Sequence, residues 1–164
     1  MLGLRRFLYL DFDGVLHPAD VWLVPGEGFR LGPGLGEHAL FEHAGLLQCL
    51  LEPQKDVGLV LSTSWVPGIG LEQAVARLPA ALARRVVGAT FDPSRHGRAF
   101  SSVARGYQVL EHAQRHGISD WAALDDDARG WPEEEMRRLV QTDPVRGLGD
   151  ESARAALLAW LNRS

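Results

Sequence analysis

The chain has 164 residues, of which 46% are hydrophobic and 23% are charged, and its net charge is -4. These values predict one globular domain, residues 1–164, and exclude a disordered or fibrous chain. The acidic balance also excludes a surface that is basic throughout, so any contact with nucleic acid requires a local basic patch. No apolar run reaches the roughly 20 residues of a membrane span. Because Cys49 is the only cysteine and no signal peptide is evident, we expect a cytoplasmic protein without membrane contact.

The first strong pattern is an apolar run at 7–10 that leads directly into Asp11 and Asp13. Such a run beside a turn signal predicts a buried strand, and Gly14 permits the chain to turn at its end. Strand geometry places the two acids on the same side. Two buried acids without a basic neighbour are costly, so the pattern predicts a divalent metal at this strand end.

The rest of the chain alternates between β-prone and helical patterns. Two short β-prone runs around a Pro-Gly turn predict a small hairpin within residues 20–31. Further strands are expected at 57–61, 86–89, 121–124 and 139–142, and helices at 37–51, 71–82 (interrupted or turned at Pro79), 101–116 and 150–161. This alternation predicts an α/β fold in which a parallel sheet has helices on both faces and binds its ligand beyond the carboxyl ends of the strands.

Three groups of polar residues follow predicted strands and should meet at that edge of the sheet. They are Asp11 with Asp13, Ser62 with Thr63, and the acidic run 125–127. One carboxylate could attack phosphorus and form an acyl-phosphate, while a second could protonate the leaving oxygen and then activate water. Carboxylate oxygens suit magnesium, and a hydroxyl and a guanidinium could hold the phosphoryl oxygens. The sequence therefore predicts magnesium-dependent phosphoryl chemistry.

The stretches 10–18, 60–65 and 124–127, with Thr142-Asp143 followed by Gly147-Leu148, resemble the haloacid dehalogenase (HAD) superfamily. Within it they are similar to the HAD-like domain of "Swiss Army Knife" RNA-repair proteins. The resemblance implies a three-layer Rossmann-like sheet of about five strands in the order 5-4-1-2-3, numbered along the chain without the hairpin. It also implies a phosphatase that removes a phosphate from RNA or DNA ends through an aspartyl-phosphate intermediate. A phosphatase of nucleotides or other small phosphoesters, and a non-catalytic module that binds phosphate or nucleic acid, are the alternatives.

Carried over by position, the resemblance gives the two acids of the first motif separate roles. Asp11 would be the nucleophile and Asp13 the general acid and base. Both would contact magnesium, Asp13 through its backbone carbonyl. Ser62 would contact the phosphoryl group, with Thr63 as the alternative.

The third and fourth motifs leave alternatives open. The third requires a basic residue upstream of the fourth strand; Arg105 is the first choice and Arg98 the second. In the fourth motif, Asp125 or Asp126 would bind magnesium.

The spacing of the strands leaves no room for a large cap domain, so only the hairpin would screen the site. An open site suits a large substrate such as a nucleic-acid end, on whose bases Trp22 and Trp65 could stack. A local basic face could hold the phosphate backbone, although solvated helix faces explain the same charges equally well. Its residues would be Arg77, Arg84, Arg85, Arg95, Arg98 and Arg105.

Overall fold

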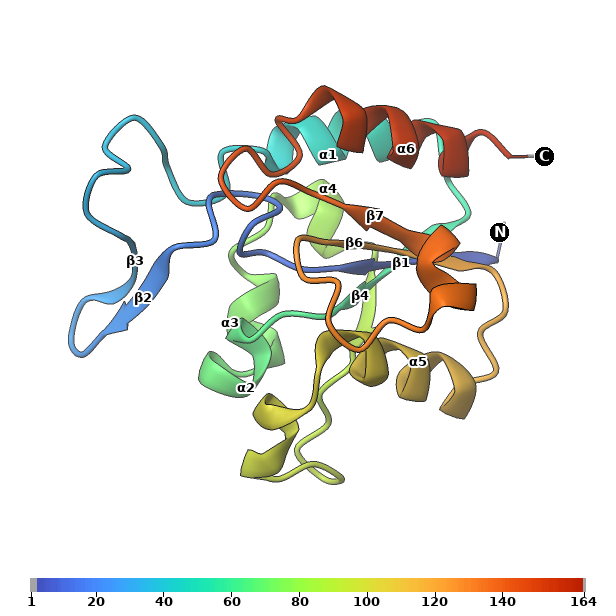
Figure 1. Cartoon of the computed structure of the whole chain (residues 1–164), viewed down its shortest axis with the longest axis horizontal. Coiled ribbons are helices and arrows are strands. Elements are labelled where there is room, and N and C mark those ends of the chain that lie inside the picture. Colours follow the sequence, from blue (N-terminus) through green and yellow to red (C-terminus); the bar gives the residue numbers. More distant parts are fainter. Residues whose placement is uncertain (1–2, 164) are drawn as a thin grey trace.

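A computed structural model describes residues 3–163 and contains a five-stranded parallel sheet (Figure 1). Its strands lie in the order β5-β4-β1-β6-β7, which confirms the predicted order once the hairpin strands are left out of the numbering. The two central neighbours of β1 are buried along their whole length, as expected of a parallel sheet covered on both faces. The strands are β1 (Arg6–Leu10), β4 (Val57–Leu61), β5 (Val86–Ala89), β6 (Trp121–Asp125) and β7 (Leu139–Gln141).

Helices cover both faces of this sheet (Figure 1). Helices α1 (Ala44–Leu51) and α6 (Glu151–Leu161) lie on one face, and α5 (Arg105–Arg115) lies on the other. The shorter helical segments lie in the connections between the strands. They are α2 (Trp65–Ile69), α3 (Leu71–Val75) and α4 (Ala80–Ala83), with the 3-10 helices η1 (Arg98–Ser102) and η2 (Glu133–Arg138).

The core divides into two clusters because successive strand residues point to opposite faces. Leu8 and Leu10 of β1 pack in the cluster beneath α1 and α6, whereas Tyr9 packs with Val109 of α5. The Tyr9 hydroxyl lies 2.8 Å from Nδ1 of His112, also on α5. This alternation holds β1 at the centre of the fold, so that its carboxyl end has a fixed place between the neighbouring strands.

Two predicted helices are shorter in the structure, for identifiable backbone reasons. The helix predicted at 37–51 begins only at Ala44, because Phe41 has φ of 60° and a right-handed helix cannot include that conformation. The helix predicted at 71–82 is two short helices, α3 and α4, and the second begins directly after Pro79. Proline favours the start of a helix because it has no N–H to donate inside one.

The helix predicted at 101–116 also starts later than expected. Val103 and Ala104 have extended backbone angles, and α5 begins at Arg105. The C-terminal end agrees with the prediction, since Gly117 adopts φ of 63° just beyond the helix. The late start matters because it places Arg105 in the first turn of α5.

The predicted hairpin is present as β2 (Val21–Val24) and β3 (Gly28–Leu31), an antiparallel pair that extends away from the sheet (Figure 1). Phe29 attaches it to the body of the protein, with its ring stacked 3.7 Å from that of Trp65. Trp22 on the other strand is 62% exposed. The hairpin therefore has one face anchored in the core and one face open to solvent.

The described residues contain no large cap domain, as predicted. The hairpin and α1 are the helices and strands between β1 and β4, and η1 is the element between β5 and α5. Within residues 3–163, no helix has both the length and the apolar character that crossing a membrane requires.

The prediction that Arg85 belongs to a basic face is wrong, because its guanidinium binds backbone carbonyls of the fold. Its nitrogens donate to the backbone carbonyls of Leu51, Gln54 and Val57 at 2.7, 2.6 and 3.0 Å. These bonds tie the end of α1 and the start of β4 to the segment before β5. The neighbouring Arg84 is exposed.

Replacing Arg85 should therefore affect stability. Arg85→Leu removes the three hydrogen bonds that the guanidinium donates to these carbonyls, and we expect the free energy of unfolding to fall by about 2–4 kcal/mol. The matched control Arg84→Leu should change it by less than about 0.5 kcal/mol. Urea unfolding of both variants measures the difference, and equal losses would contradict this role of Arg85.

Candidate active site

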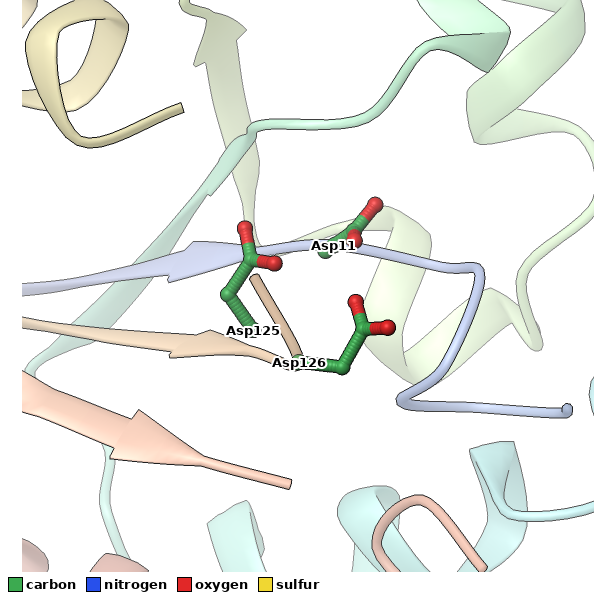
Figure 2. A group of neighbouring side chains, drawn as sticks. All are labelled: Asp11, Asp125 and Asp126. Carbon is green, nitrogen blue, oxygen red and sulfur yellow. The ribbon is translucent and has the colours of Figure 1, made fainter. Parts of the chain in front are cut away.

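Three carboxylates meet where the central strands end. Asp11 follows β1, Asp125 is the last residue of β6, and Asp126 follows it; Figure 2 shows their carboxyl groups gathered together. Each offers one oxygen, and these three oxygens lie within 4.8 Å of one another. Asp11 and Asp125 are only 4% and 1% exposed. The sequence predicted this meeting point from the rule that parallel strands present their carboxyl ends at one edge of a sheet.

The turn that follows Asp13 depends on Gly14. This residue has φ of 78°, and a Cβ at its position would overlap the side chain of Asp126. The hydroxyl of Thr142, which follows β7, donates to the Gly14 carbonyl at 2.6 Å. The chain after β7 thus fixes the turn that follows Asp13.

Arg105 supplies the positive charge of the site. Its Nη1 lies 3.5 Å from Oδ1 of Asp11 and 3.7 Å from Oδ2 of Asp125, and it donates to Oγ of Ser62 at 3.4 Å. The structure thus brings the first-choice arginine to the acids and to the predicted hydroxyl. Arg98, the alternative, is exposed on η1.

The electrostatics of the cluster are dominated by burial. Burial, and then repulsion from Asp125, raise the pKa of Asp11 well above its usual range, against the attraction of Arg105. Burial likewise raises the pKa of Asp125 to about 7, again opposed by Arg105, and raises the pKa of Asp126. One guanidinium does not compensate three crowded carboxylates. A divalent cation would correct this imbalance.

The donor set fits magnesium. Three carboxylate oxygens within reach of one point are the hard ligands that this ion takes in proteins, usually with water completing its shell. Asp125 and Asp126 each offer one oxygen to this group. The next acid, Asp127, instead pairs with Arg129, whose Nη2 lies 2.7 Å from its Oδ2.

Asp13 lies at the same cavity but stands apart from the three clustered acids. With Asp11, Arg105 and Asp126 it lines a cavity of about 350 Å³. Its Oδ1 accepts a hydrogen bond from Nε1 of Trp65 at 2.8 Å and lies 2.8 Å from Nε2 of His17. His17 was not among the predicted site residues. Its only signal in the sequence is its place four residues after Asp13, beyond the glycine turn.

The prediction that Trp65 stacks on a base is wrong, because its ring is completely buried. Thr63, the alternative to Ser62, is also buried, and its Oγ1 accepts from the backbone N–H of Trp65 at 3.3 Å. It is Ser62 whose hydroxyl meets Arg105. Trp22 is exposed on the hairpin, where its Nε1 donates to Asp20 at 2.8 Å.

A parallel sheet in this strand order, with Asp-x-Asp-Gly after its central strand and an acidic pair after the next, defines a HAD-like domain. The family model for the HAD domain in Swiss Army Knife RNA repair proteins matches residues 7–153, and the chain belongs to this family. No curated protein and no solved structure matches the chain.

Proposed function

We propose that the protein is a magnesium-dependent phosphoester hydrolase that works through an aspartyl-phosphate on Asp11. The observation that carries this proposal is the arrangement of Asp11 within 4.8 Å reach of Asp125 and Asp126, with Arg105 beside it. A nucleophile, a guanidinium that can bind phosphate and a set of metal donors thus lie at one edge of the sheet. Asp13 at the same cavity provides the acid and base.

In the first half of the reaction, a carboxylate oxygen of Asp11 attacks phosphorus and the bond from phosphorus to the ester oxygen breaks. The backbone N–H of Phe12 donates to Oδ1 of Asp11 at 2.8 Å and so orients this carboxylate. Asp13 gives its proton to the departing oxygen, which leaves as an alcohol. Arg105 and Ser62 hold the phosphoryl oxygens.

In the second half, Asp13 takes a proton from water, whose oxygen attacks the same phosphorus. The bond to Asp11 breaks, inorganic phosphate is released, and Asp13 is again protonated for the next turnover. Magnesium, held by Asp11, Asp125, Asp126 and the backbone carbonyl of Asp13, would supply charge neutralisation at the phosphoryl group.

We further propose nucleic-acid ends, above all RNA ends, as the substrates. The family's description names RNA repair, and the described residues place no cap domain over the acids. The exposed ring of Trp22 on the hairpin offers a surface for a base of the strand.

A comparison of substrates tests this choice. We expect a higher kcat/KM on a terminally phosphorylated RNA oligonucleotide than on a mononucleotide, with magnesium required for both. Trp22→Ala should lower kcat/KM on the oligonucleotide by about 5–100-fold, the loss of one stacked base, and leave the mononucleotide unchanged. Leu23→Ala, at the adjacent exposed position, is the matched control.

Each other outcome points to an alternative. Preference for the mononucleotide, unaffected by Trp22→Ala, would favour a phosphatase of small phosphoesters. Oligonucleotide binding without any phosphate release would favour a non-catalytic module.

A further inference from the structure

The carboxylate of Asp13 is held from behind by two buried side chains. Nε1 of Trp65 and Nε2 of His17 both lie 2.8 Å from the same atom, Oδ1 of Asp13. Trp65 and His17 are completely buried, whereas the side chain of Asp13 is 24% exposed. Nothing in the reaction described above uses either side chain directly.

The hydrogen-bond roles in this contact are fixed by the groups around it. An indole N–H can only donate, so Trp65 donates to Asp13. The backbone N–H of Phe41 donates to Nδ1 of His17 at 3.0 Å, which makes Nδ1 an acceptor. A neutral imidazole with an acceptor at Nδ1 carries its hydrogen on Nε2. His17 therefore also donates to Oδ1 of Asp13.

The backbone is shaped to make this arrangement. The N–H of Gly14 donates to the carbonyl of His17 at 2.9 Å, which folds the chain after Asp13 back on itself. Phe41 holds its N–H toward His17 with φ of 60°, a conformation that is an outlier for a bulky residue. Unfavourable backbone angles persist where the surroundings demand them, often at functional sites.

The hairpin supports Trp65, one of the two donors to Asp13. Phe29 of β3 stacks on Trp65 at 3.7 Å with an interplanar angle of 15°, and Phe41 packs edge-on against the same ring at 5.2 Å. The indole is thus held by an element that projects from the sheet. The anchored face of the hairpin thereby has a role at the site as well as in packing.

We propose that His17 and Trp65 are positioning residues that clamp Asp13 through Oδ1, so that Oδ2 is the oxygen that exchanges protons with substrate and water. This proposal rests on the proposed role of Asp13 as general acid and base. With two donors on Oδ1, the proton of the acid form is carried on Oδ2. The clamp would keep that atom turned toward the cavity that Asp13 shares with Asp11 and Arg105.

Trp65→Phe tests the clamp because it removes the N–H and keeps an aromatic ring against Phe29. The matched control is Trp160→Phe, since Nε1 of Trp160 is buried without a hydrogen-bond partner among the described residues. The substrates are an alkyl phosphate, whose leaving group needs a proton, and a dinitrophenyl phosphate, whose leaving group does not. We expect Trp65→Phe to lower kcat/KM at least about tenfold on the alkyl ester and less than about threefold on the dinitrophenyl ester. Trp160→Phe should leave both values unchanged.

A structural role alone would lower kcat/KM equally on both esters, and that result would overturn the clamp while leaving the proposed function standing. A wild-type protein that releases phosphate neither from these esters nor from a terminally phosphorylated RNA oligonucleotide would overturn the proposed function and, with it, the catalytic consequence of the clamp. The hydrogen bonds themselves have a readout that needs no turnover. In ¹H–¹⁵N spectra, Asp13→Asn should shift the indole signal of Trp65 and the ring nitrogens of His17 but not the indole signal of Trp160. An unmoved Trp65 signal would show that the contact with Asp13 is not made.

Discussion

Asp11→Asn should lower magnesium-dependent phosphate release by about 10⁴-fold or more, because an amide cannot form the aspartyl-phosphate. The change keeps the side-chain oxygen that accepts from the N–H of Phe12 at 2.8 Å, so the local geometry should persist. It also removes one of three crowded carboxylates. We therefore expect the metal-free variant to melt at or above the temperature of the metal-free wild type, and magnesium to raise its melting temperature less.

The matched control for this variant is Asp120→Asn, because Asp120 is exposed and lies just before β6, at the opposite end of that strand. It should retain wild-type turnover and a wild-type response to magnesium. Substantial turnover by Asp11→Asn would remove Asp11 as the nucleophile. A large drop in its metal-free melting temperature would instead indicate that the Asp11 carboxylate stabilises the fold.

Arg105→Met should lower kcat/KM by about 10²–10³-fold, the usual cost of losing one well-placed group that stabilises developing negative charge. The structure gives Arg105 three contacts at the site, to Asp11, Asp125 and Ser62. Arg105→Lys should recover only part of the loss, because an ammonium lacks the planar fork of a guanidinium. Steady-state kinetics at saturating magnesium measures both effects.

Arg98→Met separates the two arginines that the sequence could not distinguish. Arg98 is exposed on η1, and its loss should leave turnover of a small ester near the wild-type value. If Arg98→Met were the damaging change and Arg105→Met the harmless one, the assignment of the phosphate-binding arginine would have to be reversed.

The sequence predicted the features that follow from periodicity and strand order. Apolar runs indicated the five strands, and the rule that parallel strands present ligands at their carboxyl ends correctly placed Asp11, Ser62 and Asp125 at one edge of the sheet. The hairpin also followed from local turn chemistry. These inferences succeeded because each depends on residues close together in the chain or on a general rule of topology.

What the sequence missed depends on side chains that meet across long separations. Trp65 was expected to stack on a base, but Phe29 stacks on its ring. No local sequence pattern predicts that contact. Arg85 was predicted to be part of a basic face, yet it donates to backbone carbonyls 28 to 34 positions earlier in the chain. The late start of α1 depends on the backbone of Phe41, whose N–H donates to His17, 24 positions earlier in the chain.

The most direct test of the mechanism is to trap the phosphorylated residue. Wild-type protein is mixed with magnesium and a phosphoester substrate, denatured in acid during turnover and reduced with borohydride, which converts an acyl-phosphate to an alcohol. Peptide mapping then locates the change. We expect the reduced side chain at Asp11 and at no other acid, and no modification when substrate is omitted. Rapid turnover with Asp11 unmodified, or modification at Asp13 or Asp125 in its place, would contradict the proposed mechanism.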